Sequence, residues 1–400
     1  MGDTTYSISI TWIYRIWQFH GIAPSSYNQQ DCRCFDKKLL QKFTKYLTIS
    51  SIWIIIAVFM TISDFYVASQ HLYLSAPRVT IYTDMLLKLM THIRCFSMSF
   101  HCSFSKLSHF SSFLAAIHHA DKLLDPNIVH MQRNAGNFIF VVDIIIAVIS
   151  GASSLSTFSK RFGRFTTLQM AITVYAIFCD FSITMQFVES VLELWIRLKC
   201  LNASLVKTLS CLGEPNLSQL LLGWQQKEQH VDLSGRLRLL QRAHLVLQRA
   251  AEFLETHVSP AMTFHVVYSV LGTIYSSYEV LIALVVPEQV ESILVTPSLS
   301  FSACWLVRHV FELVALTLSC SALQDQEAQA TTLLRRAAGL TGEEPEVKAF
   351  LSQLERGPTL RFTASGLLPI DRRLLVSAIS ATVTYLVLLG QLGLTSSSRC

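Results

Sequence analysis

The last hydrophobic segment of the chain, residues 373–395, carries hydroxyl and amide side chains at helical spacing. At about 100° per residue they fall within roughly 80° of one another. A hydrophilic stripe on a bilayer-crossing helix must face protein or water, because lipid solvates it poorly. Such a stripe suits the wall of a pore for hydrated ions, with a leucine as an apolar constriction. It equally suits packing against neighbouring helices. The stripe comprises Ser377, Ser380, Thr384, Leu388, Gln391 and Thr395.

The sequence shows no motif for enzyme activity, metal binding or nucleic-acid binding. The sequence contains no P-loop, no G-x-S-x-G and no H-E-x-x-H motif, so we expect no enzyme activity. None of the ten cysteines forms a C-x-x-C pair, and Cys32 and Cys34 lack the spacing of a zinc knuckle. The net charge of +5 comes without a basic stripe, which argues against nucleic acid as a partner. We expect no metal and no cofactor.

Composition predicts a membrane protein. Hydrophobic residues make up 51% of the 400 residues and charged residues only 15%, whereas soluble domains carry about 25% charged residues. A membrane-spanning helix needs about 20 apolar residues. Seven segments qualify, namely 47–67, 80–104, 136–158, 166–195, 260–286, 299–322 and 373–395. Because Lys88 and Arg94 interrupt the second, six spans are the alternative. We predict an all-α integral membrane protein.

The distribution of Lys and Arg predicts the orientation of the spans. Most of these residues lie in the N-terminal segment and in the connections that share its side of the membrane. We therefore expect a cytosolic N-terminus and an extracellular C-terminus, the reverse of a G-protein-coupled receptor. Two glycosylation sequons, at Asn202 and Asn216, would then be cytosolic and unmodified, whereas the opposite topology would make them acceptors.

Several helices are expected to continue into the cytosol. The fourth span runs on to Trp195 without a breaker, and apolar residues recur at helical spacing between 237 and 253. Gly213, Pro215 and Asn216 mark a loop between these stretches. Residues 323–357 are also helical in pattern, with a turn between Gly342 and Pro345. This pattern predicts a helical cytosolic layer that assembles subunits; a solvated linker is the alternative.

The end of the chain resembles the C-terminal signature of the insect gustatory receptor family. That signature has Thr-Tyr, five hydrophobic residues and then Gln-Phe. Thr384, Tyr385 and Gln391 match it at the required spacing, whereas Leu392 stands where the family has Phe and Gly390 is unusual before it. Upstream, residues 362–364 and 370–372 also resemble the family.

The resemblance implies a tetrameric, ligand-gated, nonselective cation channel whose seventh helices line one central pore. The pore and gate positions would be Thr384, Tyr385, Leu388, Gln391 and Leu392. A leucine in place of phenylalanine would seal the pore less bulkily, make it leakier, or mark a subunit that depends on a heteromeric partner.

The resemblance also implies a ligand pocket in the outer half of each subunit. Charges within the membrane there are functional candidates by default. Arg308 and Glu312, four residues apart, could instead pair with each other. Aromatic residues in this region suit a pocket for a polar ligand or an aromatic belt at the membrane interface. The candidates are Tyr82, Asp84, Gln169, Tyr175, Tyr275, Tyr278, Glu279, Trp305, Arg308 and His309.

Together these features divide the chain into six parts. They are a cytosolic segment (1–46), spans one to four (47–195), a cytosolic helical connection (196–259), spans five and six (260–322), a second cytosolic helical connection (323–372), and the pore helix with a short tail (373–400). We expect a gustatory receptor in the plasma membrane of a sensory neuron, in its dendrite. Its partners would be a small tastant, lipids and other receptor subunits in a homo- or heterotetramer. An odorant-receptor-like or a metabotropic chemoreceptor is the alternative.

Overall fold

The computed structural model describes residues 107–124, 164–213, 225–285, 299–341 and 345–397, with scattered residues between 55 and 152. For residues 164–183, 225–233 and most of 389–397 it describes the helix but not the side chains. The first three predicted spans therefore lie largely outside the described residues. The described residues are almost entirely helical.

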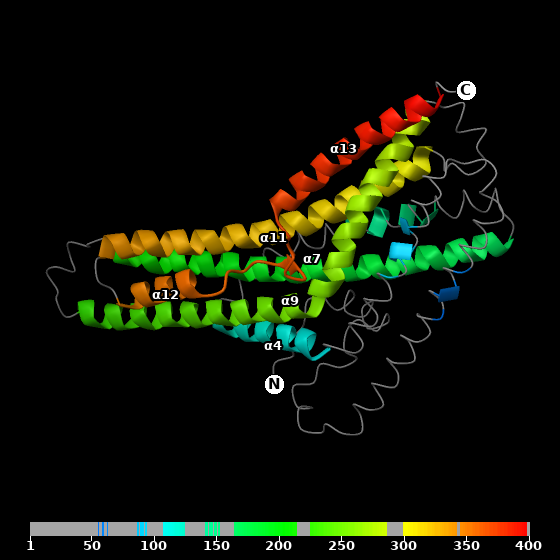
Figure 1. The fold of residues 1–400 in the computed structure, drawn as a ribbon. Coiled ribbons are helices and arrows are strands. Elements are labelled where there is room, and N and C mark those ends of the chain that lie inside the picture. Colours follow the sequence, from blue (N-terminus) through cyan, green and yellow to red (C-terminus); the bar gives the residue numbers. More distant parts are fainter. Residues whose placement is uncertain are drawn as a thin grey trace, which may run out of the picture.

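Three long helices set the architecture. They are α7 (Arg164–Gly213), α9 (Gln225–Val285) and α11 (Leu299–Thr341), with 50, 61 and 43 residues. A helix rises about 1.5 Å per residue, so each is much longer than a membrane crossing requires. The portions of these helices beyond the predicted spans, residues 196–213, 225–259 and 323–341, lie side by side in one elongated layer (Figure 1). We call these the inner portions, and the layer the inner layer; the remaining portions are the outer ones. The expected continuation of the fourth span beyond Trp195 is confirmed, and α7 ends at Gly213; the loop predicted after it, in residues 214–224, lies outside the described residues.

Two shorter helices complete this inner layer. Helix α4 (Leu107–Leu123) packs against α9, and α12 (Pro345–Arg356) packs against α9 and α11. Helix α12 is amphipathic and buries Val347, Phe350 and Leu354. Helix α11 ends at Thr341 and α12 begins at Pro345, on either side of the predicted turn; residues 342–344 themselves lie outside the described residues.

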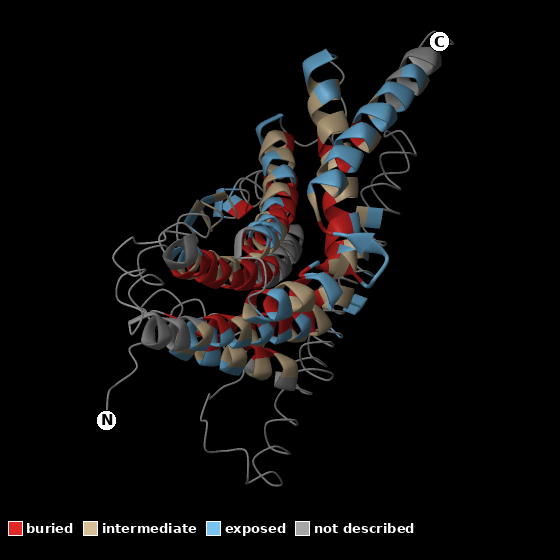
Figure 2. Cartoon of the chain, turned by 90° about the vertical axis from the view of Figure 1, so that its left-hand side faces the viewer, coloured by how far each residue is buried: buried red, intermediate tan, exposed pale blue. Residues whose placement is uncertain are grey.

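The inner layer has a continuous hydrophobic core. Phe110 of α4, Leu198 of α7, Leu247 of α9 and Phe350 of α12 are all fully buried in one cluster. Figure 2 shows this as a band of buried residues through the layer. Burial of large apolar side chains on this scale stabilises a packed domain. Among the described residues, the segments below the predicted spans thus form a folded layer rather than a solvated linker.

Asn202 belongs to this packed layer. Its side chain is 3% exposed, and its amide donates hydrogen bonds to the backbone oxygen and Oε1 of Gln326 in α11, at 2.8 and 3.1 Å. A sugar on Asn202 is incompatible with this packing, because it would separate the two helices. The packing thus agrees with an unmodified Asn202; Asn216 lies outside the described residues.

Two described segments are long and apolar enough to cross a membrane, Ser234–Val285 in α9 and Leu299–Gly339 in α11. They contain the predicted spans five and six. The predicted seventh span corresponds to α13 (Arg372–Ser397), which leaves the inner layer and runs beside the outer portions of α9 and α11 (Figure 1).

A small hairpin connects the inner layer to α13. Strands β1 (Thr363–Ala364) and β2 (Leu368–Pro369) pair antiparallel, with Thr363 opposite Pro369 and Ala364 opposite Leu368. Ser365 and Gly366 both have positive φ, 53° and 73°, as a tight hairpin turn requires. The sequence pattern predicted only a helical connection over residues 323–372. The helix ends at Arg356, because Gly357 and Pro358 do not continue it.

Candidate functional site

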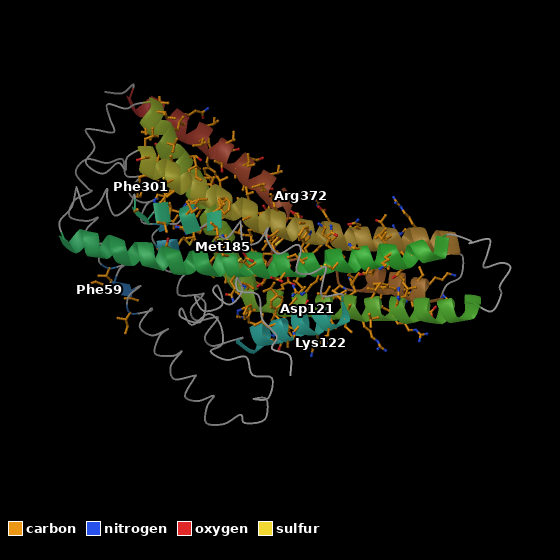
Figure 3. The ribbon with its side chains drawn as sticks, turned by 180° about the vertical axis from the view of Figure 1, so that it is seen from behind. Phe59, Asp121, Lys122, Met185, Phe301 and Arg372 are labelled. Atoms are coloured by element: carbon orange, nitrogen blue, oxygen red, sulfur yellow. The ribbon has the colours of Figure 1, made fainter. Side chains whose placement is uncertain are left out.

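The first turn of α13 is fixed by polar contacts on both sides. Asp371 Oδ1 accepts the backbone N–H groups of Arg373 and Leu374, at 2.8 and 3.3 Å, and so caps the helix. The Arg372 guanidinium pairs with Asp325 of α11 at 2.6 Å, and its backbone N–H donates to Ser321 Oγ at 3.1 Å. Figure 3 shows Arg372 where α13 leaves α11.

Beyond this turn, α13 presents two different faces. Ala378 and Thr382 are buried and mark the side that contacts α9 and α11. The predicted hydrophilic stripe lies on the other side, and its members Ser377, Ser380, Thr384, Leu388 and Gln391 are all exposed. Figure 2 shows the described part of α13 as largely exposed.

Thr384 and Tyr385 of the signature are therefore accessible in the single chain. Thr384 donates its hydroxyl hydrogen to the Ser380 backbone oxygen at 2.8 Å, which leaves the hydroxyl oxygen able to accept a hydrogen bond. The Tyr385 side chain is half exposed. Leu392 lies within α13, but its side chain is outside the described residues.

The outer portion of α11 holds a buried ion pair. Arg308 Nε donates to Glu312 Oε1 at 2.8 Å, and the two side chains are 1% and 0% exposed. The Arg308 guanidinium also lies over the Trp305 ring, 5.1 Å from its centroid. Pairing between Arg308 and Glu312, considered as an alternative above, is thus present. Because the charges compensate each other, the pair adds little net charge to this region.

An aromatic contact joins this cluster to α9. The His309 ring lies 5.7 Å from Trp305 and 5.0 Å from Tyr268, in an edge-on arrangement with the tyrosine. Gly272 of α9 makes this approach possible, because a Cβ there would meet three ring atoms of His309 at 2.5–2.7 Å. Trp305, Arg308 and His309 thus lie together against α9.

Closer to the extracellular end expected of these helices, a polar contact links α9 with α11. Ser302 Oγ donates to Glu279 Oε2 at 2.8 Å. Tyr275 and Tyr278 lie half buried on the same stretch of α9. Among the remaining candidates, Gln169 and Tyr175 lie in α7, but their side chains are not described. Tyr82 and Asp84 lie outside the described residues. Six of the ten predicted pocket residues are therefore placed. Glu279 and His309 make contacts between α9 and α11, Trp305 and Arg308 lie beside His309 on α11, and Tyr275 and Tyr278 lie on the same stretch of α9 as Glu279.

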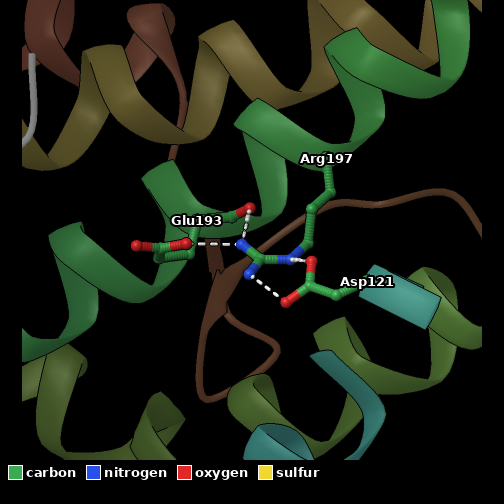
Figure 4. Close-up of polar contacts among 3 residues, drawn as sticks. All are labelled: Asp121, Glu193 and Arg197. Atoms are coloured by element: carbon green, nitrogen blue, oxygen red, sulfur yellow. Dashed lines mark hydrogen bonds and ion pairs between the residues drawn. The ribbon is translucent and has the colours of Figure 1, made fainter. Parts of the chain in front are cut away.

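A second buried charge cluster joins α4 to α7 in the inner layer. Arg197 donates through Nε and Nη2 to the two carboxylate oxygens of Asp121, both at 2.8 Å, and through Nη1 to Glu193 (Figure 4). The Arg197 side chain is 3% exposed. Glu193 and Arg197 are four residues apart in α7, a spacing that places them on one face of the helix. Asp121 was not expected, because no sequence spacing relates residues 76 positions apart.

Among the described residues, no group of His, Cys, Asp and Glu side chains is arranged to hold a metal ion. The described cysteines Cys200, Cys304 and Cys320 are free thiols.

Comparisons with known proteins agree on a family and a fold. Residues 12–396 match the family model described as 7tm Chemosensory receptor. The fold is similar to that of the insect olfactory receptor OR5 from Machilis hrabei in complex with eugenol, with a TM-score of 0.69 and 13% identity. A second structure of that receptor gives 0.66 and 13%. Each match covers 96% of this chain and 98% of the other. No curated protein matches in sequence.

Proposed function

Because the chain belongs to the 7tm chemosensory receptor family, we propose that it is a gustatory receptor that acts as a ligand-gated, nonselective cation channel. A small tastant would bind within the outer portion of the subunit. Four subunits, alike or different, would place their α13 helices around one pore in the plasma membrane of a sensory neuron. Binding would shift an equilibrium between closed and open arrangements of α13.

The exposed hydrophilic stripe of α13 carries this proposal. A membrane helix that exposes a row of hydroxyl groups, as Ser377, Ser380 and Thr384 do, needs water or another subunit on that side. A ring of such helices meets both needs, because the stripe then lines a hydrated pore and the flanks contact neighbouring subunits. The flanks suit this arrangement, since Val376, Ile379 and Val383 are apolar and more than half exposed.

The α9–α11 cluster supports a ligand site above that pore. Trp305, Tyr275 and Tyr278 offer aromatic surface, and Glu279 offers a carboxylate already bonded to Ser302. Recognition pockets of small molecules combine apolar walls with a few fixed polar groups. Because the Arg308 charge is compensated by Glu312, this interface favours a neutral, partly aromatic or hydroxylated ligand over a multiply charged one.

The signature residues favour a taste receptor over an odorant receptor. Thr384, Tyr385 and Gln391 keep the gustatory spacing, whereas the similarity to an olfactory receptor at 13% identity concerns the fold. The ligand class decides between the two. Responses to water-soluble sugars or bitter compounds support a gustatory receptor, and responses confined to volatile compounds support the odorant-receptor alternative.

Electrophysiology tests the proposal. The chain is expressed in oocytes, alone and with other receptor subunits, and membrane current is recorded during application of sucrose, caffeine and eugenol. We expect evoked cation current that persists when G-protein signalling is blocked. Current that disappears under G-protein blockade would identify a metabotropic receptor instead. Gln391→Ala is expected to change ion selectivity or basal current, and an unchanged channel would reject the gate assignment.

A further inference from the structure

The β1–β2 hairpin is hydrogen-bonded to the inner portion of α9 at two residues one turn apart. The Thr363 hydroxyl donates to Glu255 Oε1 at 2.7 Å. One turn further, Ser259 Oγ donates to the backbone oxygen of Thr363 and accepts the backbone N–H of Ser365, both at 2.8 Å. One serine side chain thus holds the hairpin backbone at two points.

A third contact lies on the other side of a proline. Pro260 stands inside α9, where it removes a backbone hydrogen bond and kinks a helix; α9 changes direction between its inner and outer portions (Figure 1). Beyond Pro260, the Thr263 hydroxyl lies 2.7 Å from the Ser365 hydroxyl. The hairpin therefore bridges the proline, with Ser259 bonded on one side and Thr263 on the other.

The hairpin is also firmly joined to α13. The backbone N–H of Ile370 donates to the Phe362 backbone oxygen at 3.0 Å, and both side chains are buried. Phe362 packs edge-on against Phe187 of α7, with ring centroids 5.2 Å apart. Asp371, the next residue, caps α13. A displacement of the hairpin must therefore move the first turn of α13.

We propose that the hairpin is a mechanical link that carries a tilt of the outer portion of α9 about Pro260 to the base of α13. The outer portion of α9 bears Gly272 and Glu279 of the α9–α11 cluster. The link thus connects the proposed ligand region with the proposed pore helix through Thr263 and Ser365. Its role in gating rests on the channel function proposed above, whereas the physical coupling of α9 to α13 does not.

Hydrogen exchange measures the coupling without a ligand. Thr263→Val keeps the shape of the side chain and removes the hydroxyl that contacts Ser365. Thr332→Val is the matched control, because its hydroxyl bonds only to the Ala328 backbone oxygen of its own helix. In the full-length protein in nanodiscs, Thr263→Val is expected to raise amide exchange at least about threefold in 372–382 as well as in 363–369. A change confined to 363–369, or no change, would overturn the link.

A reversible cross-link tests its role in gating. The Thr263→Cys, Ser365→Cys double variant replaces both hydroxyls of the 2.7 Å contact with thiols. Under reducing conditions we expect evoked current to be about tenfold lower than in the wild type, as in each single variant, because the contact is lost. Oxidation to the disulfide joins the hairpin to outer α9 and should restore the current in the double variant alone, and dithiothreitol should abolish it again. A reduced double variant that opens like the wild type, or one that oxidation does not restore, would reject the gating role. If the wild type itself gives no current with sucrose, caffeine or eugenol, the channel proposal fails, and hydrogen exchange still decides the coupling.

Discussion

Removing the Arg197 guanidinium is expected to destabilise the inner layer strongly. In Arg197→Met the apolar stem is kept, but Asp121 and Glu193 lose their shared cation. Breaking a buried ion pair from one side costs about 3–5 kcal/mol. The Asp121 side chain is 33% exposed and can regain water, which favours the lower end of this range. We therefore expect a loss of about 3 kcal/mol.

Asp121→Asn is a milder change at the same cluster. Asparagine keeps one acceptor for Arg197, and Glu193 remains as its counter-ion, so the expected cost is about 1–2 kcal/mol. In the Arg197→Met, Asp121→Asn double variant, the neutral asparagine no longer needs a cation. The stability loss of the double variant should therefore be about 1–2 kcal/mol smaller than the sum of the two single losses, as expected for residues in direct contact.

The matched control is an exposed ion pair. Arg335 and Glu355 also lie 2.8 Å apart, but their side chains are 68% and 44% exposed. Exposed pairs contribute at most about 1 kcal/mol, so Glu355→Gln should change little. Apparent unfolding temperatures of the purified variants, measured at one heating rate, provide the comparison.

For domains of about 150–250 residues, one kcal/mol corresponds to about 2–4 °C. Arg197→Met should therefore lower the midpoint by about 6–12 °C. If Arg197→Met and Glu355→Gln unfold at the same temperature, burial has not strengthened the cluster, and the reasoning is refuted.

Two further predictions concern buried side chains. Burial lowers the pKa of His244 to about 4 from an ordinary 6.5. Between pH 6.5 and about pH 4 the unfolded chain therefore binds a proton at this residue and the folded chain does not. The free energy of unfolding should fall by about 3 kcal/mol across that window, since one pKa unit corresponds to about 1.4 kcal/mol. Unfolding temperatures measured against pH should lose this slope in His244→Leu, and a retained slope would assign it to another group. Gly272→Ala should cost about 1–3 kcal/mol by displacing His309, whereas Gly339→Ala, with open space around it, should be neutral or slightly stabilising. Equal unfolding temperatures for the two alanine variants would contradict the close approach.

Hydrophobic patterning predicted the long helices well, because their apolar runs and breakers are local. The continuation of α7 past Trp195, its end at Gly213 and the start of α12 at Pro345 each depend on neighbours within a few residues. Spacing within one helix likewise brought out Arg308 and Glu312, since residues four apart lie on the same face.

Contacts between distant segments could not be read in this way. Asp121 meets Arg197 across 76 positions, and Ser259 meets Thr363 across 104. Nothing local distinguishes Ser259 from other serines near a proline. The hairpin itself was missed, since its two-residue strands are too short to show a period, although the Ser365–Gly366 turn is a local signal.

In the proposed channel the hydrophilic stripe of α13 lines the pore, and cysteine accessibility measures directly whether it does. Thr384→Cys places a thiol on the stripe, and Ile379→Cys places one on an exposed apolar flank. A positively charged, water-soluble thiol reagent is applied to open channels of each variant. We expect a rapid, lasting loss of current in Thr384→Cys and little effect in Ile379→Cys. Block of Ile379→Cys with Thr384→Cys untouched would contradict it.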